Sequence, residues 1–198
     1  MPPLPPVTKA LMLICTAVFC VQKFLPVDAL FALWPLGSGR FWPWQVVSYA
    51  FLHGDMMHLF FNMLGLWMFG SELERLWGRN RYLQMLLASV IAAALVQLGF
   101  TLLTGSRAPT VGASGGLFGL LLSYGMLFPN RVIMPLFPPI PMKARTFVMV
   151  FGGLELLFGL TGGGGVAHFA HLGGMLGAWV MISWWRGKLP FSGPRRRR

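Results

Sequence analysis

Residues 82–103 read YLQMLLASVIAAALVQLGFTLL and contain no charged side chain. About 20 mostly apolar residues are enough for a helix to cross the hydrocarbon layer of a membrane, which is about 30 Å thick. This stretch therefore predicts a membrane-spanning helix. Several other stretches of the chain share its composition, so the same prediction extends to them.

The composition of the whole chain agrees with a membrane location. Of its 198 residues, 56% are hydrophobic and only 11% are charged, whereas a soluble domain has about 25% charged residues. These figures exclude an ordinary soluble domain and a disordered chain. The expected spans are residues 10–25, 57–76, 82–103, 114–128, 146–160 and 166–185. We therefore predict an all-α membrane protein in which a single domain, residues 1–198, contains six transmembrane helices.

The segment between the first two spans, residues 26–56, is too irregular to be a helix of that length. It is rich in Trp, Phe, Pro and Gly, and aromatic side chains are enriched at membrane–water interfaces. We expect a structured loop that is partly embedded in the membrane.

The basic residues predict the orientation. The chain has 16 Lys and Arg against five Asp and Glu. With the N-terminus inside, only Lys23, Arg40 and Arg107 fall on the outer side. The positive-inside rule therefore places both termini in the cytoplasm. Residues 186–198 form a basic cytoplasmic tail in this interpretation, and binding to nucleic acid is not expected.

A serine begins a short span. Residues 114–128 end before Pro129, and their length is below the hydrocarbon thickness, so Ser114 is expected to lie below the outer surface in a pocket that water reaches. The sequence Gly112-Ala113-Ser114-Gly115 suits a nucleophile at a helix N-terminus, where free N–H groups can stabilise an oxyanion. Close helix packing by Gly115 and Gly119 is the alternative.

Polar residues on two other spans fit the same interpretation. His171 lies in the last span, where an ionisable side chain is costly and marks a functional candidate, and Gly174 follows it on the same face. His58 and Asn62 are four residues apart and share a face of the second span. Both could donate to an oxyanion, although interhelical hydrogen bonding would also explain them.

Three ordered motifs give the chain a resemblance to a known family. They are His53-x4-His58-x3-Asn62, Gly112-Ala113-Ser114-Gly115 and Ala170-His171-x2-Gly174, and Gly70-x3-Glu74-x3-Gly78 is a further match. With these motifs the chain resembles the rhomboid intramembrane serine proteases in their compact six-helix bacterial form. The expected fold is then the six-helix rhomboid bundle with the embedded loop between the first two helices.

The resemblance implies a catalytic dyad of Ser114 as nucleophile and His171 as general base. His58, Asn62, the backbone N–H of Ser114 and the turn at Gly112 would hold the oxyanion. The resemblance further assigns supporting roles: Phe118 packs on the histidine ring, His53 and Glu74 hold the embedded loop, and Gly115 and Gly174 belong to the motifs around the dyad. Membrane protein substrates, the lipid bilayer and a bacterial inner membrane are implied, with the active site opening to the outer side. No cofactor or metal is expected.

Some residues depart from the family pattern. Trp44-Gln45 stands where many bacterial members have Trp-Arg, which leaves the polar anchoring of the loop open. Glu155 lies in the fifth span, where a watered cavity or a loop donor is the favoured explanation and orientation of His171 the less favoured one. His168 is expected to be structural.

Two other functions share some of these features. A rhomboid-like protein that binds membrane helices without cutting them is the alternative to the protease, although the chain retains both Ser114 and His171. A metalloprotease is disfavoured because the sequence has no HExxH motif.

Overall fold

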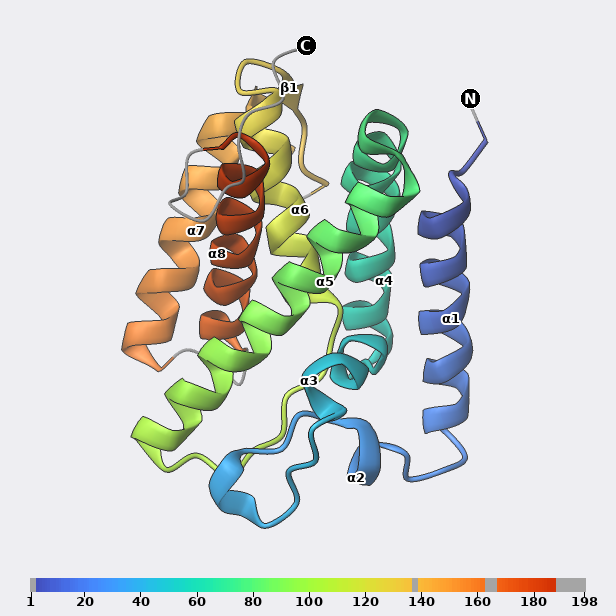
Figure 1. Cartoon of the computed structure of the whole chain (residues 1–198), viewed down its shortest axis with the longest axis vertical. Helices are drawn as coiled ribbons and strands as arrows, with labels where there is room; N and C mark the ends of the chain where they lie inside the picture. Colours follow the sequence, from blue (N-terminus) through green and yellow to red (C-terminus); the bar gives the residue numbers. More distant parts are fainter. Residues whose placement is uncertain (1–2, 137–138, 163–166, 188–198) are drawn as a thin grey trace.

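The computed structural model describes residues 3–136, 139–162 and 167–187, and these residues are mostly helical. The long helices are α1 (Pro6–Gln22), α4 (Met56–Gly65), α5 (Ser71–Thr104), α6 (Ser114–Leu127), α7 (Ala144–Thr161) and α8 (His168–Trp185). Shorter elements are the helices α2 (Asp28–Phe31) and α3 (Gln45–Ser48), the 3-10 turns η1 (Leu36–Ser38) and η2 (Tyr49–Phe51), and the π-helical turn η3 (Leu66–Gly70). An antiparallel pair of two-residue strands, β1 (Val132–Ile133) and β2 (Met142–Lys143), precedes α7. The long helices lie side by side in one bundle (Figure 1).

Within the described residues, two helical segments meet the length and hydropathy expected of a membrane span. They are Met56–Thr104, which joins α4, η3 and α5, and Ala144–Thr161; Pro6–Gln22 and Ser114–Leu127 are apolar but shorter. Gly78 interrupts the long segment with a φ of 74° and a ψ of 169°. Glycine adopts a positive φ at little steric cost. The chain therefore reverses direction near Gly78, and α5 returns along the bundle packed against α8 and α6 (Figure 1).

Glycines bring α5, α6 and α8 unusually close together. A Cβ atom on Gly174 of α8 would lie 1.8 Å from the carbonyl oxygen of Gly115 on α6. A Cβ atom on Gly173 would lie 2.8 Å from the carbonyl oxygen of Ala92 on α5. Small residues permit this kind of close approach between helices in membranes. Since Ser114 and His171 lie next to these contacts, the helix packing sets the distance between them.

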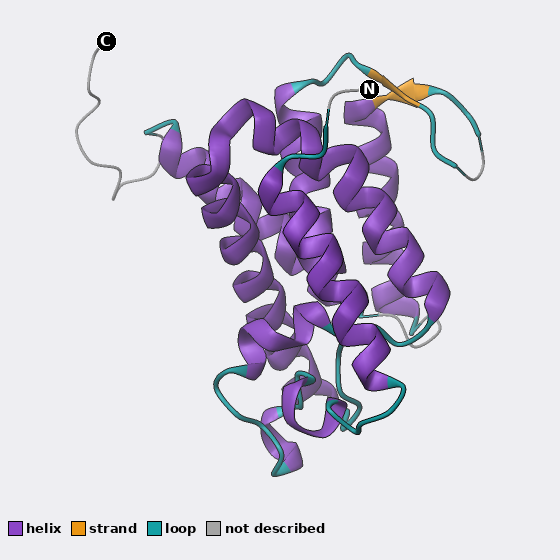
Figure 2. Cartoon of the chain, turned by 90° about the vertical axis from the view of Figure 1, so that its right-hand side faces the viewer, coloured by secondary structure: helices purple, strands orange, loops and turns teal. Residues whose placement is uncertain are grey.

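The segment between α1 and α4 covers one end of the bundle (Figures 1 and 2). Gln45, which is fully buried, holds it: its amide nitrogen donates to the carbonyl oxygens of Leu30 and Arg40, and its oxygen accepts from the N–H of Trp34. Gln45 thus provides polar anchoring of the loop, although many bacterial members of the family have arginine at this position.

Glu74 corrects an expectation. It was expected to hold the embedded loop, but its carboxylate instead accepts from the N–H groups of Val7 (2.9 Å) and Thr8 (2.7 Å) and from the Thr8 hydroxyl (2.8 Å). The first N–H groups of a helix have no partner within the helix. Pro6 occupies the first position of α1, so Glu74 accepts from the next two N–H groups. It therefore fastens α1 to α5.

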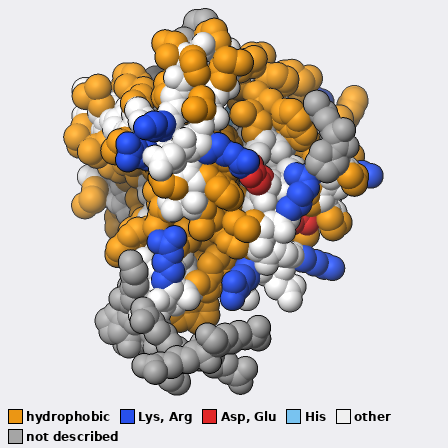
Figure 3. Space-filling view, turned by 90° about the horizontal axis from the view of Figure 1, so that it is seen from above, with side chains coloured by type: hydrophobic (Ala, Val, Ile, Leu, Met, Phe, Trp, Pro, Cys, Tyr) orange, Lys and Arg blue, Asp and Glu red, His pale blue; other side chains and the backbone are white. Residues whose placement is uncertain are grey.

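Lys and Arg side chains gather at the end of the bundle where α1 begins and α8 ends (Figure 3). The described basic residues at this end are Lys9, Arg75, Arg79, Arg81, Arg131, Lys143, Arg145 and Arg186, all exposed. Residues 188–198 of the expected tail lie outside the described part of the chain.

Candidate active site

Ser114 and His171 come together between α6 and α8. The Ser114 Oγ lies 2.8 Å from the Nε2 of His171, a hydrogen-bond distance. Phe118, one turn after Ser114, stacks on the His171 ring with centroids 4.3 Å apart and planes 6° from parallel. The histidine ring is thus held on one face by an aromatic side chain and at one nitrogen by the serine. This arrangement can transfer a proton from the hydroxyl to the imidazole.

The turn before Ser114 requires glycine. Gly112 has a φ of 126°, which side-chain-bearing residues rarely adopt. A Cβ atom there would lie 2.6 Å from His58 Nε2 and 2.7 Å from its Cε1, so the His58 ring occupies the space beside this glycine. The N–H of Gly112 donates to the carbonyl oxygen of Tyr49. The structure therefore brings His58 and Gly112 to within contact of the serine turn.

His58 and Asn62 are placed by the first turn of α4. Asp55 caps this helix, since its carboxylate accepts from the His58 N–H at 2.8 Å. This bond lowers the pKa of the exposed Asp55 carboxyl. The Gly54 N–H points to His58 Nδ1 at 3.4 Å, which leaves Nε2 as the nitrogen that carries the proton in neutral imidazole. The amide of Asn62 donates to the His58 carbonyl oxygen at 2.9 Å.

These side chains line one pocket of about 740 Å³, which has both polar and apolar walls. Ser114, His58, Asn62, Phe118 and His171 all line it, together with residues 106 and 108–111 of the segment before α6. The pocket is large enough for several water molecules or an extended peptide segment. The sequence motifs from three different spans thus converge on a single pocket.

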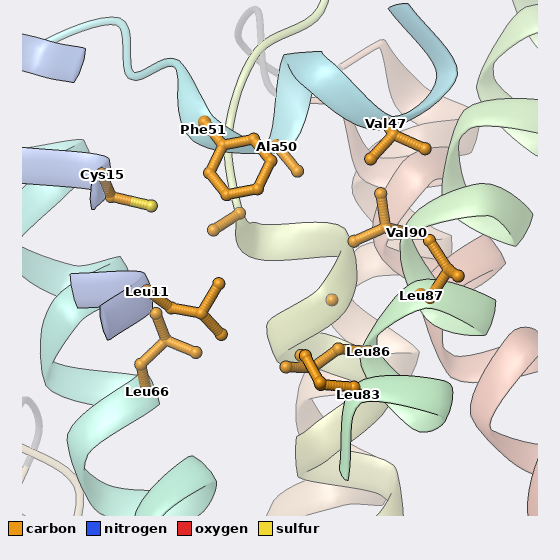
Figure 4. A pocket seen from close by; sticks show the side chains of 12 residues that line it. Leu11, Cys15, Val47, Ala50, Phe51, Leu66, Leu83, Leu86, Leu87 and Val90 are labelled. Atoms are coloured by element: carbon orange, nitrogen blue, oxygen red, sulfur yellow. The ribbon is translucent and has the colours of Figure 1, made fainter. Parts of the chain in front are cut away.

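A second cavity lies behind the site and has a different character (Figure 4). It is about 140 Å³ in volume and is lined by apolar side chains of α1, α5 and the loop, including Leu11, Phe51 and Val90. Ala113 and Gly116 close it toward α6. It has no group that could take part in acid–base chemistry, apart from the Cys15 thiol.

His53 is buried behind His58, with ring centroids 5.2 Å apart. Burial, and to a lesser extent the charge of His58, lower the pKa of His53 to about 4, which favours the neutral ring. Its backbone exchanges hydrogen bonds with the side chain of Gln22 at the end of α1. The loop is therefore fastened at His53 by the main chain, and neither ring nitrogen has a hydrogen-bond partner within the described part of the chain.

Three residues near the site were missed or assigned another role. The Tyr49 hydroxyl donates to the Val90 carbonyl oxygen at 2.9 Å, and the Tyr49 carbonyl oxygen accepts from the Gly112 N–H. Glu155 Oε2 lies 2.6 Å from His168 Nδ1 and 2.8 Å from His171 Nδ1. His168 is buried against this carboxylate. Glu155 could be recognised from the sequence because it is an isolated acidic residue in an apolar span. The sequence pattern gives no comparable indication for Tyr49.

Glu155, His168 and His171 are also the group of candidate metal ligands within the described ranges. Their donor atoms lie within 4.8 Å of one another. Ligands that share a tetrahedral zinc ion at about 2.0–2.1 Å must be about 3.3 Å apart. The contacts at 2.6 and 2.8 Å are shorter, so this cluster has the spacing of direct contacts rather than of a metal shell.

The helical bundle thus brings a half-buried serine, a buried histidine and a glycine turn together at one pocket. The rhomboid domain matches residues 40–187. The chain belongs to the rhomboid family, and it is a membrane protein.

Its relatives include proteins from yeast and bacteria. Rhomboid protein 1, mitochondrial, of Saccharomyces cerevisiae is 32% identical over 147 residues, which are 73% of this chain and 42% of the yeast protein. Rhomboid protease GlpG of Yersinia pestis is 26% identical over 184 residues, which are 90% of this chain and 62% of that protein. The chain thus matches less than two thirds of the length of each of these relatives.

Proposed function

We propose that the chain is an intramembrane serine endopeptidase that cleaves membrane protein substrates in or beside their transmembrane helices. The observation that carries the proposal is the 2.8 Å contact of Ser114 Oγ with His171 Nε2 at a pocket of about 740 Å³. Membership of the rhomboid family and the similarity to a protein named rhomboid protease support it.

The proposed reaction is acyl transfer through Ser114. The Ser114 hydroxyl attacks the scissile carbonyl carbon while His171 Nε2 takes its proton. The resulting oxyanion lies within reach of the Ser114 N–H and of His58, with Asn62 and the Gly112 turn completing the site. His171 then protonates the leaving amine, and water hydrolyses the acyl-enzyme. The step requires no metal or cofactor.

The proposed orientation places the pocket on the outer side and both termini in the cytoplasm, in a bundle of six spans. The exposed basic residues gather at the end where α1 begins (Figure 3), and the pocket-lining residues Gly54, Ser106 and Pro109 belong to loops at the opposite end. The positive-inside rule then favours a cytoplasmic basic end, as expected for a bacterial inner membrane protein.

The substrate must present an extended segment to Ser114. A transmembrane helix that carries Gly or Pro near its outer end unwinds most readily, because such residues weaken its backbone hydrogen bonding. Single-span and multi-span membrane proteins of this kind are the proposed substrates, reached from within the bilayer.

The test is cleavage of a single-span substrate by purified protein in proteoliposomes. Wild type is compared with Ser114→Ala and His171→Ala, each with and without EDTA. We expect cleavage by wild type alone, unaffected by EDTA. Cleavage that survives Ser114→Ala would overturn the mechanism. If no variant cleaves but Ser114→Ala crosslinks to the substrate as wild type does, the chain binds membrane helices without cutting them.

A further inference from the structure

The described part of α7 carries one acidic side chain, and it reaches the catalytic histidine. Glu155 Oε2 lies 2.8 Å from His171 Nδ1, on the far side of the ring from Ser114. The same oxygen lies 2.6 Å from His168 Nδ1, one turn earlier on α8. Side-chain exposures of 13% for Glu155 and 9% for His171 show that water is largely excluded from this contact.

A carboxylate in this place determines which nitrogen of His171 carries the proton. An ionised carboxylate carries negative charge and no proton, so the electrostatic field beside it makes a neutral imidazole most stable with its proton on the nearer nitrogen. For His171 this nitrogen is Nδ1. The other nitrogen, Nε2, is then unprotonated and faces the Ser114 hydroxyl, as a general base must.

The contact also opposes charge that develops during the reaction. When Nε2 takes the Ser114 proton, the ring becomes an imidazolium with protons on both nitrogens. His171 Nδ1 has no aligned hydrogen-bond acceptor in the described ranges, so the nearby carboxylate acts on it mainly through its charge. Since the interaction of opposite charges is strong where water is excluded, it stabilises the imidazolium.

The other titratable groups that face His171 cannot replace this charge. They are His58 on α4 and His168 on α8 itself, and both are neutral or positive. Among the described side chains that face His171, only Glu155 contributes a negative charge. His168 has a different part: it contacts the same carboxylate oxygen and holds it in position between the two rings.

We propose that Glu155 is a positioning residue for the protease reaction, which orients His171 and stabilises its protonated form from the neighbouring helix α7. The inference rests on the proposed function, and it makes the site a serine–histidine–glutamate arrangement in place of the dyad expected from the family resemblance. Glu155 is not among the residues that line the pocket at Ser114, and its proton count does not change in the proposed reaction.

The experiment compares Glu155→Gln, Glu155→Asp, His168→Gln and the control Glu72→Gln in proteoliposomes. Initial rates are measured against substrate concentration and against pH. Labelling of Ser114 by a fluorophosphonate is followed over the same pH range, because it reports on the serine without a peptide substrate. Thermal unfolding shows which variants are folded.

For Glu155→Gln we expect kcat to fall about 100-fold with little change in KM, because a neutral amide does not stabilise the imidazolium. The acidic limb of the rate and labelling profiles should move to lower pH by about one unit or more. Glu155→Asp should restore part of both effects. His168→Gln should lower kcat less than about tenfold, with the acidic limb in place, and Glu72→Gln should behave as wild type.

The inference would be overturned by an active wild type whose Glu155→Gln variant keeps kcat within about threefold and the same acidic limb. Identical profiles for Glu155→Gln and His168→Gln would also overturn it, because they would show a structural ion pair only. Should Glu155→Gln not fold, Glu155→Asp decides by the position of its acidic limb. A wild type that neither cleaves nor labels would instead count against the proposed function itself.

Discussion

Substitution of Gly174 by alanine should disable the site by separating two helices. The new Cβ would lie 1.8 Å from the Gly115 carbonyl oxygen and 2.7 Å from its carbon, and both are backbone atoms that cannot rotate away. Widening the first contact to the 3.4 Å of ordinary van der Waals contact moves α6 and α8 apart by about 1.6 Å. Because Ser114 precedes Gly115 and His171 lies one turn before Gly174, the 2.8 Å contact between Ser114 and His171 widens with them.

The expected magnitude follows from this displacement. A misplacement of about 1 Å between reacting groups costs about 100-fold in rate, so the kcat/KM of Gly174→Ala should fall at least about 100-fold. Overpacking should also cost about 1–3 kcal/mol of stability. The matched control is Gly153→Ala on α7, where a Cβ atom meets nothing within 4 Å, and it should retain wild-type activity and stability.

The assay is cleavage of a single-span substrate in proteoliposomes at a temperature where thermal unfolding shows both variants to be folded. A folded Gly174→Ala protein that cleaves within about threefold of wild type would refute the argument that helix packing sets the distance between Ser114 and His171.

Three further predictions concern the surroundings of the site. Gly112→Ala should lower kcat/KM about 100-fold with a folded chain, because its Cβ would lie 2.6 Å from His58 Nε2 and the φ of 126° strains any side-chain-bearing residue; unchanged cleavage kinetics would contradict this. Glu74→Gln should lower the free energy of unfolding by about 2 kcal/mol, since buried backbone N–H groups lose a charged acceptor, whereas Glu72→Gln, at a partly exposed ion pair with Arg131, should cost less than about 1 kcal/mol; equal losses in thermal unfolding would rule the difference out. The pKa of His53 is lowered to about 4 in the folded chain, so the unfolded chain binds more protons between about pH 6.5 and 4 and stability should be lost as the pH falls through that range; His53→Met should reduce this loss, and an unaltered pH dependence of unfolding would count against it.

Much of the site could be predicted because its residues are costly in a membrane. A buried histidine or asparagine in an apolar span needs a reason, and the glycines beside Ser114 and His171 indicate close approach. These features placed Ser114, His171, His58 and Gly112 in one set, and the structure brings them to one pocket.

Other features depended on contacts between distant segments. The family resemblance assigned Glu74 to the embedded loop, whereas its carboxylate caps the first turn of α1, and the motif itself gives no register for that helix. Gln45 and Tyr49 anchor the loop through hydrogen bonds to main-chain carbonyl oxygens. Every residue has such a carbonyl group, so the sequence does not show which one is the partner. The sequence shows that Glu155 is a carboxylate in an apolar span, where it is energetically costly. Its contact with His171 depends on how α7 and α8 pack against each other.

The most direct measurement of the central claim is the site of covalent modification by a fluorophosphonate. Wild type, Ser114→Ala and His171→Ala are treated in proteoliposomes, and the modified residue is identified by intact mass and peptide mapping. We predict one adduct, on Ser114, that is absent from Ser114→Ala and forms at least about 100-fold more slowly in His171→Ala. An adduct on another residue, or cleavage of substrate by the Ser114→Ala protein, would contradict the assignment of Ser114 as the nucleophile.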